Sequence, residues 1–586
     1  MIKSTLFHFL IIPPLIYFCI LLQFSYFEEP IFGAVGPIIR TSYGKLEGFQ
    51  YIMTNGERAN VFLGLPYAEP PVGQLRFEKP VPVAKWKGVR QAKKLGNICF
   101  QQSYRRLMVG PGEISEDCLY MNIHAPAKRS PNPEGYPVLL FIHGGGFVSG
   151  SANYFNYQNI SENFVSQGIV FVTINYRLSA YGFFSTGDEV ARGNYGYWDQ
   201  TRALKFIHDI IADFGGNPNL VTVSGESAGA ASTSALSLSP HSNWLLHRAI
   251  TFSGSQYSNF ANYSQVVTAS LQLATAVGCS GSSQQMKSCM KLKTADEIRN
   301  GIFKIGPGRD EFMGIMFNPT IDGEFLPAPA DQLVKTAPKI PYMAGVTDAE
   351  GGFSAYFDLP EMFTPFLMPH MWSNLTAAQF KNYLWNKFIT GGYENDISLK
   401  SSVIWKVIKF YITEGAPNQT PKELIARYID LCTDLFFALP VYQEVQDKVA
   451  AGMPSYMFLE EYHNPIMSAP FPVRGAFHGN EMPYLLGAFF PNLDFTFDDN
   501  DKKFQRDLIS AMVSFAQTGT PVVSGKRWDP VTKEHPNRYM SFDTNSQMKD
   551  GFLKESMDFW LKDVMGGADI DMLRETIAAG ARRPQK

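Results

Sequence analysis

Four short apolar runs constrain the fold of this 586-residue chain more than any other feature of its sequence. They are VLLFI (138–142), IVFVTI (169–174), LVTV (220–223) and AITF (249–252). Runs of this length without polar alternation are typical of strands that are buried on both faces of a parallel sheet. Two later runs, at 342–346 and 456–459, are further strand candidates that extend the sheet.

Helical patterns lie between these runs. From Trp198 to Phe214 apolar residues recur at spacings of three and four, and the segment ends at GGNP (215–218), a strong helix stop. Strands that alternate with helices in this order require right-handed crossovers. We therefore predict an α/β fold with a large, mostly parallel central sheet flanked by helices.

The domain organisation is simple. No fixed-period repeat or low-complexity linker occurs between Pro37 and Trp560, and turn residues are spread evenly. We predict one domain over residues 37–563 and a C-terminal tail over 564–586.

The charge balance argues against nucleic acid as a partner. The chain has 51 basic and 54 acidic residues, a formal charge of −3 and no basic stripe with interleaved aromatic residues. Recognition of a phosphate backbone needs such a stripe. With 45% hydrophobic and 18% charged residues, the chain is globular and can bury a sizeable core.

The cysteines predict disulfides rather than a metal site. Cys99 and Cys118 bracket one short segment, and Cys279 and Cys289 bracket another, so we predict two short-loop disulfides. Metal binding is the alternative, but no CxxC pair or clustered histidines support it. Cys432 lies in the apolar run LCTDLFFAL, which is typical of a buried core thiol.

The N-terminus has the pattern of a secretory signal. Lys3 precedes an apolar run from Leu6 to Leu22, so we predict a signal peptide over residues 1–25. A retained signal anchor is the alternative, because the run approaches spanning length and Ser25 is a mediocre cleavage site. No later run is long enough to span a membrane. We expect a mature chain without a stable membrane span, secreted or in the lumen of the secretory pathway.

Four Asn-X-Ser/Thr triplets are candidate glycosylation sites in that compartment. They begin at Asn159, Asn262, Asn374 and Asn418. Such triplets are common by chance. They therefore support a secreted glycoprotein only together with the cysteine pattern and the N-terminal segment.

The segment VTVSGESAGA (221–230) raises the question of whether Ser227 is a nucleophile. Gly-x-Ser-x-Gly alone is a weak motif in a chain with 49 glycines. Here it follows a Val-rich strand and continues into small residues that suit a helix, which is the setting of a nucleophile elbow. Gly225 and Gly229 would relieve clashes in so tight a turn, and a helix N-terminus would stabilise negative charge. A purely structural turn is the alternative.

A second glycine-rich segment suits an oxyanion hole. HGGGF (143–147) directly follows the strand VLLFI, and its glycines let backbone N–H groups approach a substrate oxygen closely. One such donor contributes a factor of about 10² to 10³ in rate. A flexible glycine loop is the alternative. We expect His143 to be a structural member of this loop.

Six histidines downstream of Ser227 are candidates for the general base. His478 lies in RGAFHGNE (474–481), a glycine-flanked loop that could carry an imidazole to the serine. The other five suit the role less well: we expect His463 and His535 in surface turns, His241 and His247 too close to the nucleophile helix, and His370 packed in LMPHMW.

The acid of a triad should follow a strand between the serine and the histidine. GVTDAEGG (345–352) has this position and offers both Asp348 and Glu350. Spacing alone does not choose between them.

In combination, these motifs resemble the type B carboxylesterase and cholinesterase-like family of the α/β-hydrolase fold. The likeness extends from about Tyr43 to Trp560. Its motifs are FLGLPYA (62–68), PVGQLRF (71–77), EDCLYMN (116–122), HGGGF, GNYGYWDQ (193–200), FGGNP (214–218), GESAG (225–229) and FHGNE (477–481).

The resemblance implies roles for individual residues. It makes Ser227 the nucleophile, Glu350 the acid and His478 the base. Glu350 is favoured over Asp348 because the family's glutamate immediately precedes a glycine. The resemblance also assigns the oxyanion hole to the N–H groups of Gly145, Gly146 and Ala228, and its two short disulfide loops match the cysteine pairs predicted above.

One departure from the family narrows the substrate. Choline esterases carry a tryptophan in the first disulfide loop, where its ring binds the quaternary ammonium. The loop CFQQSYRRLMVGPGEISEDC (99–118) has none, so we expect no choline specificity. Glu226 could still attract a cationic group or orient water.

We therefore expect a secreted serine hydrolase that cleaves small carboxylic esters through an acyl-enzyme, without a metal or organic cofactor. An adhesion or partner-binding protein on the same fold is the alternative from another class. A lipase-like or hormone-directed esterase would differ only in its pocket.

Overall fold

The computed structural model describes residues 36–101, 109–261, 265–306, 315–356, 367, 369–390, 397–488 and 496–564. The predicted signal segment 1–25, the sequon at Asn262 and the tail beyond Val564 lie outside these residues. Within the described residues no helix is both long and apolar enough to cross a bilayer.

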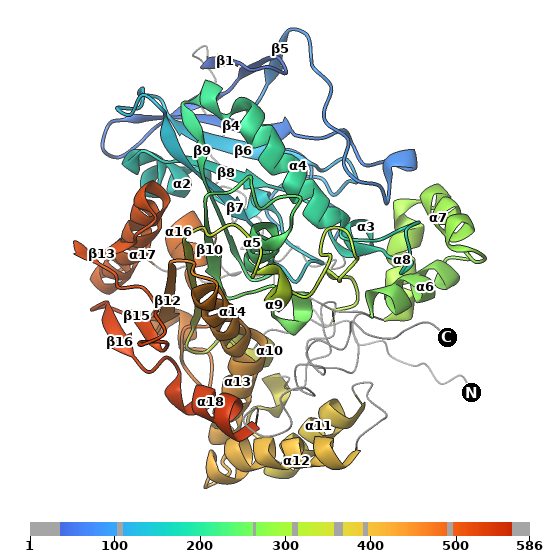
Figure 1. The fold of residues 1–586 in the computed structure, drawn as a ribbon, viewed down its shortest axis with the longest axis vertical. Helices are drawn as coiled ribbons and strands as arrows, with labels where there is room; N and C mark the ends of the chain where they lie inside the picture. Colours follow the sequence, from blue (N-terminus) through green and yellow to red (C-terminus); the bar gives the residue numbers. More distant parts are fainter. Residues whose placement is uncertain are drawn as a thin grey trace, which may run out of the picture.

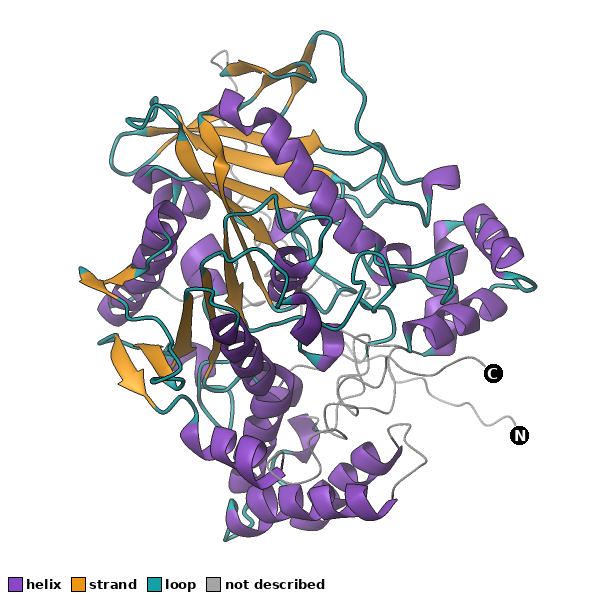
Figure 2. Ribbon diagram, in the orientation of Figure 1, coloured by secondary structure: helices purple, strands orange, loops and turns teal. Residues whose placement is uncertain are grey.

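The described residues form an α/β sandwich around an eleven-stranded sheet (Figures 1 and 2). In spatial order the strands are β16 (Gln547–Asp550), β15 (Arg538–Phe542), β12 (Ser455–Glu460), β11 (Tyr342–Thr347), β10 (Arg248–Phe252), β9 (Gly216–Glu226), β7 (Tyr136–Ile142), β8 (Val170–Ile174), β6 (Tyr120–Pro126), β4 (Arg58–Pro66) and β3 (Phe49–Ile52). The strands from β15 to β8 run parallel. At the edges β16, β6, β4 and β3 pair antiparallel. The predicted fold class is confirmed.

Helices cover both faces of this sheet (Figure 1). They are α2 (Tyr157–Asn163), α3 (Ser179–Phe183), α4 (Tyr195–Ile210), α5 (Ala228–Leu238), α6 (Val266–Ala276), α7 (Ser283–Leu292), α8 (Ala295–Ile305), α9 (Ala330–Leu333), α10 (Gly352–Tyr356), α11 (Ala377–Thr390), α12 (Ile397–Ile408), α13 (Pro421–Thr433), α14 (Leu439–Ala450), α15 (Pro465–Ser468), α16 (Met482–Leu486), α17 (Asp499–Thr518) and α18 (Lys554–Asp558). Smaller sheets join β1 (Ile38–Arg40), β2 (Lys45–Glu47) and β5 (Val89–Gln91), and β13 (Val522–Val523) with β14 (Lys526–Arg527).

Strand β7 shows why the sequence contained continuous apolar runs. Successive side chains of a strand point to opposite faces. Leu140 and Ile142 accordingly join the core under α4, α5 and α14, whereas Leu139 and Phe141 join the core under α2, α16 and α17. Both faces of this strand are buried, so a polar side chain along it would need a hydrogen-bond partner.

The sequence placed the strands correctly but not every boundary. The predicted helix 198–214 is α4 followed by a 3-10 turn over Ile211–Phe214, and Gly215 ends it in the left-handed conformation. β9 begins immediately afterwards, at Gly216. The prediction that His370 is packed in the core is wrong. The residue is exposed in a 3-10 turn, although its sequence neighbours are apolar.

Both predicted disulfides are present, Cys99–Cys118 and Cys279–Cys289. Cys432 is a buried free thiol, as predicted, and burial raises its pKa to about 12.

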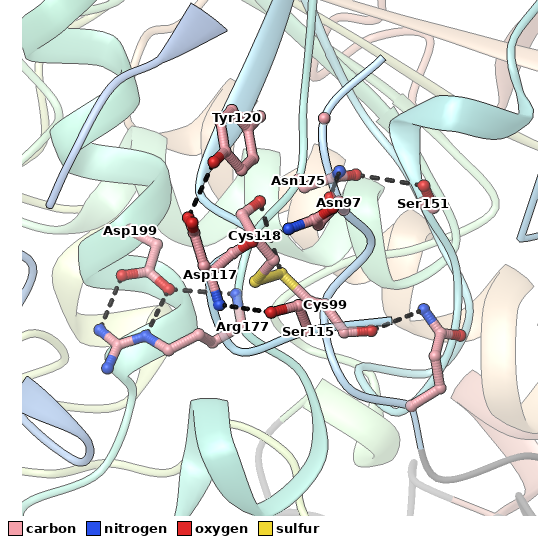
Figure 3. The surroundings of a disulfide bond; sticks show 12 residues. Asn97, Cys99, Ser115, Asp117, Cys118, Tyr120, Ser151, Asn175, Arg177 and Asp199 are labelled. Atoms are coloured by element: carbon pink, nitrogen blue, oxygen red, sulfur yellow. Dashed lines mark hydrogen bonds and ion pairs between the residues drawn. A yellow bond between two sulfur atoms is a disulfide. The ribbon is translucent and has the colours of Figure 1, made fainter. Parts of the chain in front are cut away.

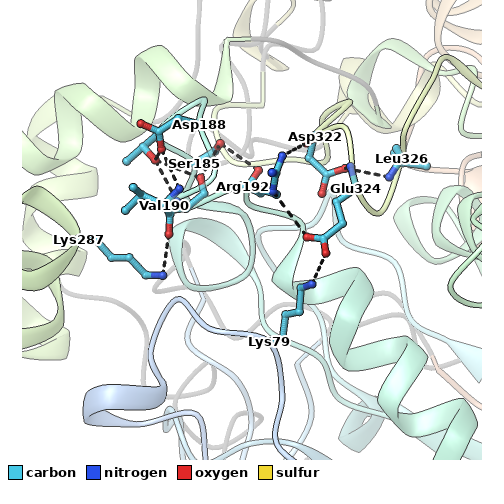
Figure 4. A network of polar contacts seen from close by, with 11 residues as sticks. Lys79, Ser185, Asp188, Val190, Arg192, Lys287, Asp322, Glu324 and Leu326 are labelled. Carbon is cyan, nitrogen blue, oxygen red and sulfur yellow. Dashed lines mark hydrogen bonds and ion pairs between the residues drawn. The ribbon is translucent and has the colours of Figure 1, made fainter. Parts of the chain in front are cut away.

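A contact from α7 joins the helical region α6–α8, which carries the second disulfide, to the loop before α4 (Figure 4). Lys287 of α7 donates to the carbonyl of Val190 at 2.8 Å. Nearby, Arg192 donates to the carbonyl of Asp322, and Lys79 pairs with Glu324 at 2.5 Å.

Candidate active site

The carboxyl ends of the parallel strands meet at one edge of the sheet, where α/β proteins bind ligands. Ile142 ends β7 beside Gly225 of β9, and Phe252 ends β10 beside Glu226. The loops that leave this edge carry the residues that the sequence singled out. His143, Gly145, Gly146, Ser227 and His478 all line one pocket there.

Ser227 occupies a strained turn between β9 and α5. Its backbone has φ 57° and ψ −122°, a positive φ that costs a residue with a side chain on the order of 1 kcal/mol or more. Flanking glycines are required on steric grounds, because a Cβ at Gly225 would lie 2.3 Å from the backbone of Gly229. A Cβ at Gly229 would lie 2.0 Å from the carbonyl oxygen of Ile142. The turn therefore places Ser227 at the N-terminus of α5, where it lines the pocket.

The glycine-rich loop after β7 lies beside this serine. Gly145 and Gly146 have φ values of 104° and 61° and line the same pocket. The polar and stacking contacts of His143 are with its own neighbourhood: its Nδ1 donates to the carbonyl of Gly144 at 2.8 Å, and its ring stacks on Tyr176. Burial lowers its pKa to about 4. This geometry is that of a neutral, structural histidine.

His478 and Glu350 are in direct contact. The imidazole Nδ1 lies 2.6 Å from Glu350 Oε2. The other carboxylate oxygen accepts the backbone N–H of Thr347 at 2.8 Å and the hydroxyl of Ser253. The carboxylate is fully buried and fixed by donors from two strand ends.

Asp348 is the other acid that the sequence left open. Its side chain contacts the backbone of the loop that carries His478, not the imidazole. Its Oδ1 accepts the N–H of Ala476 at 2.9 Å, and Ala349 N–H donates to the carbonyl of Ala476. Burial raises the pKa of Asp348 to about 7. Asp348 thus ties the loop that carries Glu350 to the loop that carries His478, a tether that no sequence pattern indicated.

Glu226 is a contact that the sequence did not predict. Its Oε1 lies 3.0 Å from Nε2 of His478, and burial raises its pKa from 4.5 to about 7. Among the described residues, the Ser227 hydroxyl makes no hydrogen bond to the ring. The imidazole therefore has a carboxyl group beside each nitrogen, Glu350 at Nδ1 and Glu226 at Nε2.

The two flanking carboxyl groups determine how many protons the imidazole and Glu226 must share. A neutral imidazole has one N–H, so it can donate to only one of two carboxylates. Either the ring or Glu226 must therefore hold an extra proton in this arrangement. Burial lowers the pKa of His478, but Glu226 and Glu350 outweigh it and raise the pKa above its ordinary value. The ring becomes a base only when this proton leaves.

Two phenylalanines pack against the imidazole. The ring of Phe437 lies 4.5 Å and that of Phe353 lies 5.3 Å from the imidazole centroid. Phe353 belongs to α10. Phe437 belongs to a π-helical segment over Asp434–Ala438, a rare conformation that often marks functional sites.

Much of the remaining pocket lining is apolar. Its further aromatic and aliphatic lining residues are Tyr154, Phe155, Phe260, Ile315, Met482 and Ala488. Among the described residues no group of three His, Cys, Asp or Glu side chains is placed to hold a metal ion.

Comparison with known proteins identifies the family. The sequence profile of the Carboxylesterase family matches residues 35–560. The chain is 34% identical over 540 residues to gut esterase 1 of Caenorhabditis briggsae, covering 90% of this chain and 93% of that protein. The chain belongs to the carboxylesterase family. It is a carboxylic-ester hydrolase, as the sequence predicted.

Other relatives of this esterase come from vertebrates. Carboxylesterase 1C of Rattus norvegicus is 31% identical over 562 residues, covering 92% of the esterase and 96% of the relative. The medium-chain fatty acyl-CoA hydrolase precursor of Anas platyrhynchos is 31% identical over 558 residues, with 90% and 92% covered. The likeness thus covers nearly the whole of each chain.

Proposed function

We propose that the esterase uses Ser227 as nucleophile, His478 as general base and Glu350 as the acid that orients it. The contact between His478 Nδ1 and Glu350 Oε2 carries this proposal, together with the pocket that Ser227 and His478 share. Glu350 holds the N–H on Nδ1, which leaves Nε2 free to accept a proton once the extra proton of the Glu226 pair has left.

In the acylation step, Nε2 of His478 accepts the hydroxyl proton of Ser227 while Oγ forms a bond to the ester carbonyl carbon. The carbonyl π electrons move to oxygen, and the oxyanion accepts hydrogen bonds from the N–H groups of Gly145, Gly146 and Ala228. The C–O bond to the alcohol then breaks, and the alcohol leaves with the proton from His478. Water, deprotonated by the same imidazole, releases the acid and regenerates Ser227.

The pocket favours an uncharged ester with an apolar acyl or alcohol group. Phe260, Ile315 and Met482 offer such a group apolar surface. The name of the Anas platyrhynchos relative, a medium-chain fatty acyl-CoA hydrolase precursor, agrees with an aliphatic acyl chain as one substrate class. We expect neutral aliphatic esters to be hydrolysed faster than choline esters of the same acid.

We further propose that the esterase is secreted after removal of residues 1–25, as one domain over 37–563 followed by the tail 564–586. Two disulfides suit an oxidising compartment. Of the candidate glycan sites, Asn374 and Asn418 are exposed, whereas Asn159 is half-buried against Gly487. N-terminal sequencing and glycosidase treatment of the protein from a eukaryotic host's medium would test these points, and an intact Met1 would contradict cleavage.

Replacement of the nucleophile tests the mechanism most directly. We expect Ser227→Ala to lower kcat on a chromogenic ester by about 10⁴- to 10⁶-fold and to abolish labelling by a fluorophosphonate. Ser224→Ala is the matched control: Ser224 lies on β9, the strand that ends just before Ser227, it is fully buried, and its hydroxyl has no partner among the described residues. It should retain activity and labelling. Undiminished turnover by Ser227→Ala would contradict the assignment.

A further inference from the structure

The glycine-rich loop needs support from outside, because the N–H groups that face the substrate must stay free of internal partners. The loop folds back on itself: the N–H groups of Val148 and Ser149 both donate to the carbonyl of Gly145. The two arms are in close contact, since a Cβ at Gly145 would lie 2.2 Å from the carbonyl oxygen of Ser149. A Cβ at Gly150 would lie 2.3 Å from that of Gly144. Any displacement of the return arm, residues 149–152, therefore moves the arm that faces the substrate.

One side chain fixes the peptide groups of Gly150. Gln101 donates from Nε2 to the carbonyl of Gly150 at 2.7 Å, and its Oε1 accepts the N–H of Gly150 at 2.9 Å. The second amide proton lies toward the carbonyl of Cys99, 3.3 Å away. Gln101 is buried, so water does not compete for these bonds. A side-chain amide offers a donor and an acceptor in this planar arrangement at any pH, whereas a carboxylate offers acceptors alone.

The chain beside Gln101 is anchored by the disulfide between Cys99 and Cys118 (Figure 3). Gln101 lies two residues beyond Cys99. A second amide acts in parallel: Asn175 donates to the carbonyl of Asn97 at 3.0 Å and accepts the N–H of Ala152 at 2.8 Å. The disulfide-bonded segment 97–101 and the return arm are therefore joined at two points.

We propose that Gln101 is a positioning residue for the oxyanion hole, acting through Gly150 on the N–H groups of Gly145 and Gly146. This inference rests on the proposed function. Oxyanion donors must lie about 2.7 to 3.1 Å from the oxygen of the tetrahedral intermediate. A small displacement of the loop therefore weakens transition-state binding while it leaves binding of the ground-state ester almost unchanged.

The test compares Gln101→Met with a control that loses a similar buried amide elsewhere. In the wild type the amide of Asn122 accepts the N–H of Gly64 and donates to Thr173 in the edge region of the sheet, and Asn122→Leu removes both hydrogen bonds. We expect Gln101→Met to lower kcat about 10- to 100-fold with KM changed less than about twofold. Its affinity for a trifluoromethyl ketone, whose hemiketal oxygen occupies the hole, should fall by the same factor as kcat/KM. Asn122→Leu should lose thermal stability but keep kcat and ketone affinity.

Gln101→Glu provides an independent measurement if Gln101→Met does not fold. The carboxylate keeps the acceptor but lacks the donor to Gly150, whereas the protonated carboxyl restores it. Its kcat deficit relative to wild type at the same pH should shrink as the pH is lowered. A deficit that is constant with pH, or a Gln101→Met variant with the kcat and ketone affinity of the control, would overturn the proposal. Absence of a ketone adduct at Ser227 in the wild type would instead contradict the proposed function.

Discussion

The two carboxyl groups that flank His478 have opposite surroundings, although each lies within 3.0 Å of a ring nitrogen. Glu350 accepts additional hydrogen bonds from Thr347 and Ser253, which stabilise and fix a carboxylate. Glu226 has its polar contact with the ring, and burial raises its pKa to about 7. The difference teaches that residue type and distance do not define a role: donors from two strand ends hold the first group in place, whereas the second can exchange a proton near neutral pH.

The comparison fails if Glu350 is dispensable. We expect Glu350→Gln to lower kcat/KM about 10³- to 10⁴-fold with little change in KM, because the amide cannot stabilise the imidazolium or fix its tautomer. Steady-state kinetics at pH 8 measure this effect. A loss below tenfold would mean that Glu226 can take over the role of Glu350.

The pH dependence of folding stability should distinguish Glu226 from Glu350. Folding raises the pKa of Glu226 from 4.5 to about 7, so the folded protein binds this proton more tightly than the unfolded chain. Stability is therefore lost progressively as the pH rises from about 4.5 to 7, and the loss remains above pH 7. We expect Glu226→Gln to be up to about 3 kcal/mol more stable than the wild type at pH 8. The two proteins should converge near pH 4.5 in denaturant titrations, and equal stability at pH 8 would contradict the buried charge.

Activity should reveal the proton that Glu226 exchanges. Because Glu226 helps to raise the pKa of His478, its replacement by glutamine lowers that pKa. The acid limb of the kcat/KM profile of Glu226→Gln should therefore shift to lower pH, with a loss of about tenfold or less on the plateau. A shift to higher pH would show that Glu226 acts on the imidazole in the opposite sense.

We expect the smallest effect from a change in the apolar surroundings of His478. Phe437→Leu removes ring contact with His478 and admits water, which weakens the burial that lowers the pKa of the imidazole. We expect a fall in kcat of about three- to fivefold and an acid limb that moves to higher pH, opposite to Glu226→Gln. Identical profiles for Phe437→Leu and the wild type would limit Phe437 to lining the pocket.

The sequence predicted the features of this site that depend on local chain geometry. A glycine-flanked serine after an apolar strand requires the turn at Ser227, and continuous apolar runs such as 138–142 require a sheet covered on both faces. The contact of Glu226 with His478 joins positions more than two hundred residues apart and follows from loop packing. The π-helical segment that carries Phe437 leaves no periodicity of its own in LCTDLFFAL. The prediction that His370 is buried was wrong because apolar sequence neighbours do not guarantee burial.

The backbone at Ser227 restricts how this enzyme could be redesigned. At φ 57° a side chain that branches at Cβ meets the flanking peptide groups, so threonine is excluded there although it also carries a hydroxyl. Cysteine has the unbranched shape of serine and can occupy the turn. With Ser227 as the proposed nucleophile, conversion of the esterase to a thiol enzyme is therefore sterically open, whereas conversion to a threonine enzyme would first require a different backbone conformation at this position.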